Sequence, residues 1–304
     1  MQQENATAKT KEKQLDIYAA VTQKIIEQLQ KDVVPWRMPW TDRGLPRNLI
    51  TKRPYRGINV LTLSMLGYEH NYFLTFKQVQ ELGCSVKKGE KSHMVVYWNY
   101  IAPKDEKVLE SEDSKAKKIP YIEYYSVFNI AQCDGFPESF TIPVDRETQP
   151  IPACEKIVED MPQKPRIQFK EQSAYYDPIR DFVNMPKQKN FDSDAAYYST
   201  FFHELIHSTG YSTRLARKDL IEMSEFGSEQ YSHEELVAEI GTCYLQSITG
   251  IQMQFEQSAA YIKGWLSKLQ NDKKFIFSAA RHAQKATDFI LNIQHEFEEQ
   301  SADE

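Results

Sequence analysis

A metal site is the clearest chemistry that the sequence offers. His203, Glu204 and His207 form the motif His-Glu-Leu-Ile-His. Residues four apart lie one above the other on a helix, so both imidazoles can face one metal ion. Glu204 can then reach a water on that ion and act as its general base. The motif is typical of zinc-dependent peptidases, and the alternative is a surface helix with ordinary polar side chains.

The segment SHEELVAEIGTCYL, downstream of this motif, offers a third ligand, which a catalytic zinc requires besides one open position. Glu235 and Glu239 are four residues apart on this second apolar helix. We assign Glu235 as the metal ligand and Glu239 as the acid that hydrogen-bonds a ligand histidine and fixes its tautomer. Glu234 faces about 100° away on the helix and is the poorer ligand. His233 or Tyr231 is a candidate for polarising a substrate carbonyl.

The surroundings of the motif favour a metal site over a surface helix. Phe201, Phe202, Leu205 and Ile206 predict that the helix is largely buried. Two imidazoles and a carboxylate on a buried helix are costly unless something pairs with them. We expect one divalent ion, with zinc as the first choice, although nitrogen and oxygen ligands also accept Mn²⁺ and other divalent ions.

A second candidate site lies in the first third of the chain. Between Lys31 and Lys91 there are 11 Lys and Arg residues and five Asp and Glu residues, with aromatic residues interleaved. Single-stranded DNA is bound by cations that neutralise its phosphates and by flat rings that stack on its bases. The alternative is that the aromatic residues are core and the cations an ordinary solvated rim. The candidate DNA-binding residues are Trp36, Arg37, Trp40, Arg47, Asn48, Lys52, Arg53, Tyr55, Arg56, Asn59, Lys77, Lys87, Lys88 and Lys91.

The periodicity of apolar residues predicts the elements that carry these side chains. Residues 15–29 are expected to form a helix, and a second, apolar helix begins at about Asn59. Thr75 is a candidate N-cap of a short helix that ends at Gly83. Residues 94–102 and 121–133 then predict two antiparallel strands, separated by a charged loop.

Residues 141–152 are rich in proline and polar side chains, and we take them as a domain boundary. A helix and three short strands are expected after it, and from Asp192 onward the pattern is helical, with packing helices after residue 250. The sequence thus predicts an α+β protein with a disordered tail (1–14), an N-terminal domain (15–145) and a mostly helical domain with a small sheet (152–304). Charge supports two modules, because residues 1–100 carry a net +6 and the remainder −12.

Composition excludes several other classes of protein. The 304 residues contain no apolar run of the ~20 residues that span a bilayer, and the polar N-terminus lacks the apolar core of a signal peptide. The four cysteines are far apart and form no disulfide framework. We therefore expect a cytoplasmic protein.

The motifs, taken in order, resemble the ArdC-type antirestriction proteins over about residues 15–250. They are PWRMPW, RPYRGINVLTL, FLTFKQVQELGCSVKKGEKSHMVVYW, STFFHELIHSTG, RLAR and EELVAEIGTCYL. The resemblance implies an N-terminal single-stranded-DNA-binding domain and a C-terminal zincin-like metallopeptidase domain. It implies that His203 and His207 are metal ligands, Glu204 the catalytic carboxylate and Glu235 the third ligand. The family is carried on conjugative plasmids and is associated with protecting incoming DNA from host restriction.

Three functions follow as hypotheses. The first is a metal-dependent peptidase brought to an unidentified protein substrate, such as a restriction-system component, by single-stranded DNA. The second is a DNA-coating protein whose metal domain is structural or regulatory. The third, an accessory to a primase or to replication, is suggested by the occurrence of a similar N-terminal domain in some plasmid primases. The segment GINVLTLSMLG is not a phosphate-binding glycine loop, so the chain itself offers no nucleotide-polymerising motif.

Overall fold

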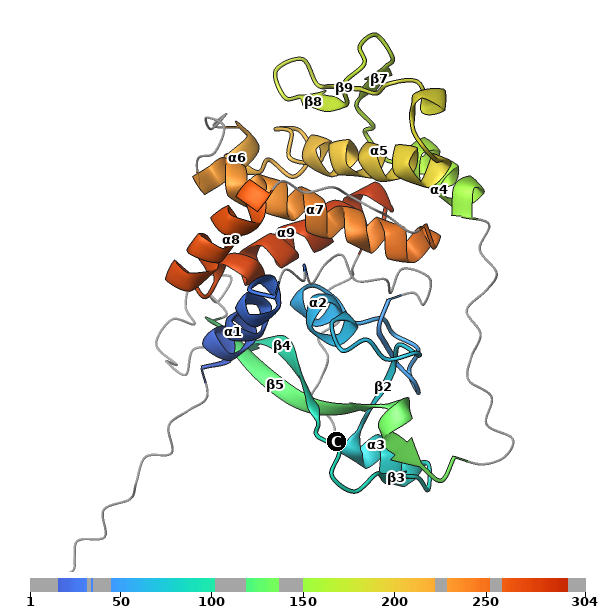
Figure 1. Ribbon diagram of the computed structural model, residues 1–304, viewed down its shortest axis with the longest axis vertical. Coiled ribbons are helices and arrows are strands. Elements are labelled where there is room, and N and C mark those ends of the chain that lie inside the picture. The colour runs from blue at the N-terminus through green and yellow to red at the C-terminus, as the bar shows by residue number, and fades with distance from the viewer. Residues whose placement is uncertain are drawn as a thin grey trace, which may run out of the picture.

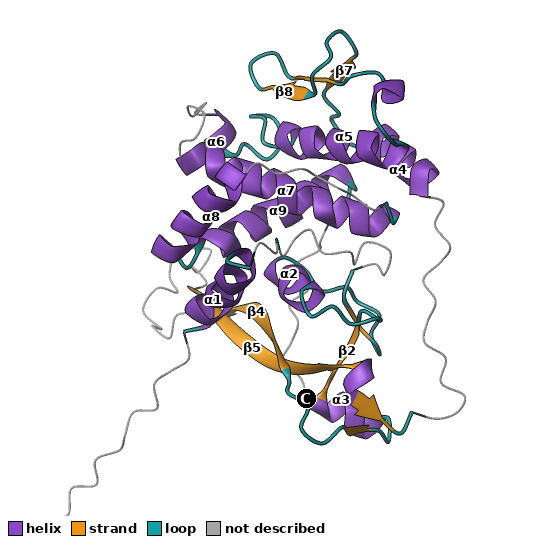
Figure 2. Ribbon diagram, viewed as in Figure 1, coloured by secondary structure: helices purple, strands orange, loops and turns teal. Residues whose placement is uncertain are grey.

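The computed structural model describes residues 16–31, 34, 45–101, 119–136, 150–221, 229–251 and 259–294. The expected tail (1–14) and the candidate DNA-binding residues Trp36, Arg37 and Trp40 lie outside these ranges. The protein has the expected α+β architecture of two domains, with a sheet below a body of helices (Figures 1 and 2). None of the described helices combines the length and the apolarity needed to cross a membrane.

The N-terminal half is built on a sheet of four strands. Its order is β1 (Arg47–Asn48), β2 (Tyr72–Thr75), β5 (Ile119–Asn129) and β4 (His93–Ile101). The antiparallel pairing of β4 with β5, with Val95 opposite Tyr125, confirms the two predicted strands. Strand β2, which the sequence analysis did not predict, runs parallel to β1 and antiparallel to β5. A separate ribbon pairs β3 (Ser85–Val86) with β6 (Cys133–Asp134).

Helices α1 (Ile17–Leu29), α2 (Ile58–Ser64) and α3 (Phe76–Glu81) accompany this sheet. The hydroxyl of Thr75 accepts a hydrogen bond from the Gln78 backbone N–H, and the Gln78 side chain accepts one from the Thr75 N–H. This capping box satisfies two otherwise unpaired donors and confirms the predicted N-cap. The side-chain amide of Asn59 bonds both the N–H and the C=O of Val96, at 2.8 and 2.7 Å. Asn59 thereby covers the outer edge of β4, which pairs with no further strand among the described residues.

The C-terminal half is mostly helical. It contains α4 (Pro150–Asp160), α5 (Asp194–Ser208), α6 (Lys218–Ile221), α7 (Glu229–Thr249), α8 (Ala259–Asn271) and α9 (Phe275–Ile290). A sheet of three strands, in the order β7 (Arg166–Gln168), β9 (Phe182–Asn184) and β8 (Tyr175–Asp177), lies beside α5. The helices α8 and α9 account for the packing role expected after residue 250.

The two halves share one hydrophobic core. Apolar side chains of α1 and α2, including Ile25 and Leu61, belong to the same cluster as those of α5, α7 and α9. Polar contacts support the junction, since the Tyr244 hydroxyl donates to the Gly57 carbonyl at 2.9 Å and Arg56 pairs with Asp288. Most of the predicted boundary segment lies outside the described residues, so its position stays a prediction.

Candidate metal centre and DNA surface

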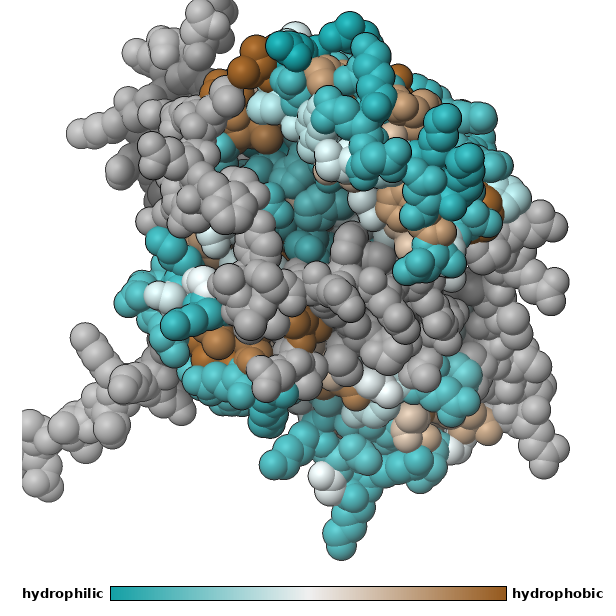
Figure 3. Space-filling model, turned by 45° about the horizontal axis from the view of Figure 1, so that its top comes forward, coloured by the Kyte–Doolittle hydropathy of each residue, from teal (hydrophilic) through white to brown (hydrophobic). Residues whose placement is uncertain are grey.

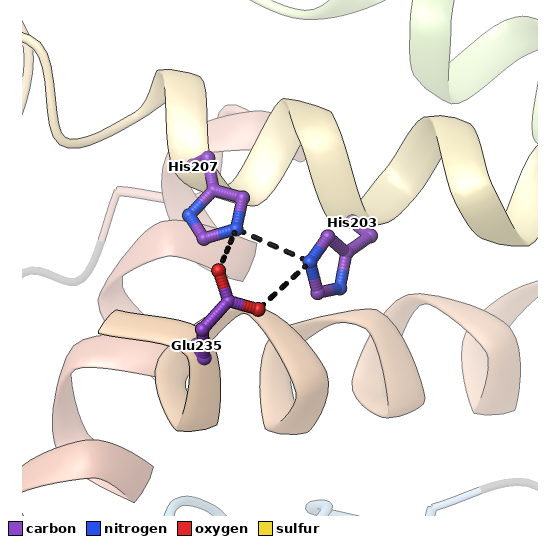
Figure 4. Close-up of side chains that lie close together, drawn as sticks. All are labelled: His203, His207 and Glu235. Atoms are coloured by element: carbon purple, nitrogen blue, oxygen red, sulfur yellow. Dashed lines mark hydrogen bonds and ion pairs between the residues drawn. The ribbon is translucent and has the colours of Figure 1, made fainter. Parts of the chain in front are cut away.

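Helices α5 and α7 bring His203, His207 and Glu235 together (Figure 4). The Nε2 atoms of the two histidines are 3.1 Å apart. The two carboxylate oxygens of Glu235 each lie 3.5 Å from one of these nitrogens. The structure therefore places the three predicted ligands around one point.

These separations fit a metal ion. Ligand atoms about 2.0–2.1 Å from a tetrahedral ion are about 3.3–3.4 Å from one another. The three distances, 3.1, 3.5 and 3.5 Å, lie close to that value, the last two ending on different oxygens of Glu235. Three protein ligands leave a fourth position for water or substrate. Figure 3 shows, in its upper half, a hollow lined by hydrophilic side chains.

Close packing of α5 on α7 positions the ligands. Helix α5 starts at an N-cap, where the Ser193 hydroxyl accepts a hydrogen bond from Ala196 N–H at 3.1 Å. Farther along α5, Ile206 is fully buried against Gly241 of α7. A Cβ atom at Gly241 would lie only 2.6 Å from the Ile206 Cδ1 atom. Glycine at this position therefore permits the helices to approach closely enough for ligands from both to meet.

The structure also reveals a buried pair that orients one of the ligands. Glu234 Oε1 lies 3.1 Å from His207 Nδ1, on the side of the ring away from Glu235. The guanidinium of Arg217 donates to both oxygens of Glu234, at 2.8 and 2.6 Å, and to the Ile206 carbonyl at 2.8 Å. Such outer partners fix the tautomer and orientation of a metal-ligating histidine.

Sequence reasoning missed Arg217 and gave the orienting role to Glu239. At His207 this assignment is wrong, because Glu234 makes the contact. Glu239 is buried, and its charge helps to raise the pKa of His203, so a role for Glu239 at that ligand stays a prediction. The sequence feature that could have indicated this role is the second arginine of the RLAR segment, Arg217, which precedes the second helix.

The electrostatics of the site favour a cation. Burial alone would lower the pKa of His207, but hydrogen bonds to Glu234 and Glu235 raise it well above its usual 6.5. Burial alone would raise the pKa of Glu234, but Arg217 and His207 lower it to about 2. The pKa of Glu235 is likewise held far below its usual range by the two histidines, against the effect of burial. Imidazoles that bind protons this strongly lie in a negative electrostatic potential. A divalent ion bound between them can take the place of those protons.

Two further side chains were expected at this site. Glu204 is buried on α5 next to His203, and its charge helps to raise the pKa of that histidine. His233, by contrast, bonds Asp219 at 2.7 Å and packs against Phe275, on the opposite side of α7 from Glu235. The prediction that His233 polarises a substrate carbonyl at the metal is therefore wrong, and the side chain of Tyr231 lies outside the described residues.

The structure removes two residues from the expected DNA surface. Tyr55 is only 7% exposed and packs edge-on against Phe73 in a core cluster. Asn59 is equally buried and bonds the backbone of Val96 with its side chain. Both residues stabilise the fold, so their assignment to DNA is wrong.

Three more of the expected residues have partners within the protein. Asn48 donates to Gln78 at 2.9 Å and accepts from the backbone of the turn that follows it. Arg56 pairs with Asp288 across the two halves. Arg47 is half-buried and donates to the Leu45 carbonyl at 3.5 Å. These contacts explain the three side chains without DNA.

The remaining cations are exposed. They are Lys52, Arg53, Lys77, Lys87, Lys88 and Lys91. Lys87 also donates to the Ala131 carbonyl at 2.9 Å, which leaves part of its side chain tied to the turn. Their role in DNA binding stays a prediction.

Exposed rings occur where the sequence analysis expected only strands. Tyr97 on β4 and Tyr125 on β5 are about half exposed, with ring centroids 5.2 Å apart. Phe76, at the start of α3, is also about half exposed. The sequence feature that could have indicated these exposed rings is the run of aromatic residues in the two predicted strands. These rings provide flat apolar surface in the N-terminal half, which also carries the exposed cations.

Comparison with protein families matches each half separately. Residues 15–128 match the N-terminal domain of anti-restriction factor ArdC, and residues 152–282 match a zincin-like metallopeptidase domain. The protein y4eC of Sinorhizobium fredii is 33% identical, with 93% of this chain and 94% of that protein covered. Two proteins of Escherichia coli named DNA primase TraC are 35% and 32% identical over 92% and 91% of this chain. The chain spans only 28% and 20% of their lengths.

Solved structures extend this similarity to the fold. The metal-free structure of the antirestriction protein ArdC from the R388 plasmid is 37% identical, covers 92% of this chain and 100% of its own, and gives a TM-score of 0.74. The Mn(II)-bound structure of the same protein gives 0.73 at the same identity, with 93% of this chain and 100% of that chain covered. The chain therefore belongs to the ArdC family of antirestriction proteins, and its C-terminal half is a zincin-like domain.

Proposed function

We propose that this protein protects the incoming DNA of a mobile element from host restriction by combining two activities. It binds single-stranded DNA without sequence preference, and it cleaves a protein substrate at a metal-dependent peptidase site. The observation that carries the proposal is the convergence of His203, His207 and Glu235 next to Glu204. A cytoplasmic location fits both activities.

The three ligands would hold one divalent ion through two imidazole nitrogens and a carboxylate. An ion bound there would supply Lewis-acid chemistry and lower the pKa of a bound water towards neutrality. We propose zinc, because this ligand set is typical of catalytic zinc. The Mn(II)-bound structure of the R388 relative supports a divalent ion and makes manganese the second choice.

The residues of the chain divide the remaining work. Glu204 accepts a proton from the attacking water and later delivers it to the leaving nitrogen. Glu234 and Arg217 hold His207 in one orientation, so the ligand does not have to reorganise during the reaction. The burial of these groups strengthens their electrostatic interactions. We propose a protein of the host restriction system as the substrate class, because the chain belongs to an antirestriction family.

The DNA activity is assigned to the exposed cations and rings of the N-terminal half. Lysine and arginine side chains would neutralise phosphates, and bases would stack on Tyr97, Tyr125 and Phe76. These three rings are exposed, and the cations Lys52, Lys77 and Lys88 are exposed as well. Contacts of this kind read no base edges, so binding should be non-specific.

The substitution Glu204→Gln tests the enzymatic half of the proposal. The variant should still bind the metal and single-stranded DNA, because no proposed ligand changes. It should lose both proteolysis and restriction protection. Glu159→Gln, at an exposed glutamate of α4 outside the site, is the matched control and should behave as the wild type. Full protection by Glu204→Gln would refute peptidase-dependent protection.

That result would favour the second candidate, a DNA-coating protein with a structural or regulatory metal domain. The separation of the exposed cations from the metal ligands supports this alternative, because coating needs only the first group. Substitution of the cations would then abolish protection, whereas substitution of Glu204 would not. An accessory role in priming is supported only by the similarity to the two TraC proteins, of which the chain spans about a quarter.

A further inference from the structure

A cavity of about 620 Å³ lies between α6, α7 and α9, apart from the proposed metal ligands. His233 of α7 and His282 of α9 form part of its wall, with Phe275 beside them. Because His233 and Glu235 are two positions apart on a helix, their side chains leave α7 in nearly opposite directions. The cavity is therefore a separate site and not an extension of the metal cradle.

Each of the two imidazoles of the cavity wall has a buried nitrogen atom that no described residue pairs. His233 is only 8% exposed, and its Nδ1 bonds Asp219 at 2.7 Å. Its Nε2 and the Nδ1 of His282 are buried and have no hydrogen-bond partner among the described residues. The two rings are perpendicular, with centroids 5.6 Å apart. Since buried polar atoms are nearly always hydrogen-bonded, this arrangement indicates a site for a polar ligand group.

The charge around the cavity is positive. Lys218 and Lys285 line it, and neither pairs with a carboxylate in the part of the chain that the structure describes. The single carboxylate of the wall, Asp219, is engaged by His233. Burial and the neighbouring His233, Arg281, Arg217 and Lys285 lower the pKa of His282 to about 4. The two lysines on the wall favour a ligand that carries negative charge.

A metal ion alone fits the cavity poorly. Two imidazole nitrogens are present, but no third histidine, cysteine or carboxylate joins them as a ligand group among the described residues. Two lysines on the wall would also repel a cation. Phosphate suits this wall better, because lysine side chains act as point charges towards phosphate.

The size of the cavity calls for more than a phosphate group. Cavities of ~300–1,000 Å³ hold organic ligands of drug or cofactor size. Leu215 and Phe275 give the wall an apolar part next to its charged part. We propose that this cavity binds a phosphorylated organic molecule of about the size of a mononucleotide. Its phosphate lies against Lys218 and Lys285, and its organic part against Phe275.

The wall of the cavity also reaches the partner of a metal ligand. Arg217 lines the cavity and holds Glu234 against His207. Lys218 and Asp219 follow it directly in α6. An occupant would therefore contact the segment that orients His207, which makes it a modulator of the metal site and not its substrate.

Calorimetric titration of the full chain, kept metal-free with a chelator, tests the proposal with deoxyadenosine 5′-monophosphate as the probe. We expect saturable binding that the double substitution Lys218→Ala and Lys285→Ala weakens at least about tenfold. Lys263→Ala removes an exposed lysine of α8 away from the cavity and should leave binding unchanged. Inorganic phosphate should compete with the probe, but bind more weakly because it lacks the organic part.

Two further arms separate the cavity from other sources of binding. Ser278→Trp places a large ring on the cavity wall without changing charge, and it should abolish binding in a protein that circular dichroism shows to be folded. Lys87→Ala with Lys88→Ala alters the DNA surface and should leave probe binding intact. Absence of saturable binding up to about 10 mM, equal weakening by Lys263→Ala, or equally tight binding of glutarate would each overturn the proposal. None of these measurements depends on peptidase activity, so the proposal can fail while the peptidase stands.

Discussion

Replacing Glu234 by glutamine should weaken metal binding although every proposed ligand remains. Glu234 contacts His207 Nδ1 at 3.1 Å, and both side chains are almost completely buried. Glutamine has nearly the same shape and can still accept a hydrogen bond from that nitrogen. It lacks the negative charge that makes the imidazole a stronger donor to a metal ion.

The expected loss follows from this single contact. Removing an outer partner of a metal-ligating histidine typically lowers affinity 10–100-fold, which equals about 1.4–2.7 kcal/mol. The substitution also removes the charge that pairs with Arg217, whose side chain is 4% exposed. A buried ion left without its partner costs about 3–5 kcal/mol, so the variant should melt at a lower temperature than the wild type.

Isothermal titration of the metal-free full chain with Mn²⁺ measures the effect well below the melting temperature. Glu159→Gln is the control for an exposed glutamate, and Glu239→Gln tests the orienting residue that sequence reasoning chose. A folded Glu234→Gln protein that binds Mn²⁺ as tightly as the wild type would refute the orienting role of Glu234. A larger loss in Glu239→Gln than in Glu234→Gln would transfer that role to Glu239.

Three further predictions concern different parts of the molecule. Asn59→Ala should lower the free energy of unfolding by about 2–4 kcal/mol, since the N–H and C=O of Val96 both lose a buried partner; urea unfolding measures this, and an unchanged midpoint would contradict it. Lys87→Ala with Lys88→Ala should reduce the slope of log K against log salt for single-stranded DNA by up to about 1.4, and an unchanged slope would remove this turn from the DNA surface. Mn²⁺ affinity should fall as the pH falls through the raised pKa of His207, because protons then compete with the ion. Titration with Mn²⁺ at several pH values tests the sign of this dependence. An affinity that rises with acidity would be inconsistent with histidine ligands.

The sequence was sufficient to predict the three side chains that the structure brings together, because their geometry is mostly local. The spacing of His203 and His207 defines one face of a helix, and the same periodicity predicts the helix that bears Glu235. Only the contact between the two helices is long-range. It depends on Gly241, whose missing side chain makes room for Ile206.

The orienting residue could not be predicted in the same way. A helical wheel shows that Glu234 and Glu235 point in different directions, but it does not show which side chain each of them contacts. The partner that decides the matter, Arg217, lies directly before α6, and its contacts to Glu234 depend on how α6 packs on α7. The helical spacing of Glu239 from Glu235 therefore gave the wrong orienting acid at His207.

The DNA surface shows the limit of composition as a guide. Tyr55 and Asn59 lie in a basic, aromatic segment, yet the fold buries both. Asn59 is buried because β4 has an open edge, and that edge depends on strand pairing. Strand β2 was missed because it has only four residues and nearly all of them are buried. Its sequence therefore shows no alternation of polar and apolar side chains.

Anomalous diffraction from a crystal of this protein soaked in Mn²⁺ tests the central claim most directly. We predict one strong peak about 2.0–2.3 Å from the Nε2 atoms of His203 and His207 and from the carboxylate of Glu235, and its loss in His203→Ala. Absence of a peak between α5 and α7, or a peak coordinated by other side chains with Glu235 turned away, would contradict the assignment of these three residues as metal ligands.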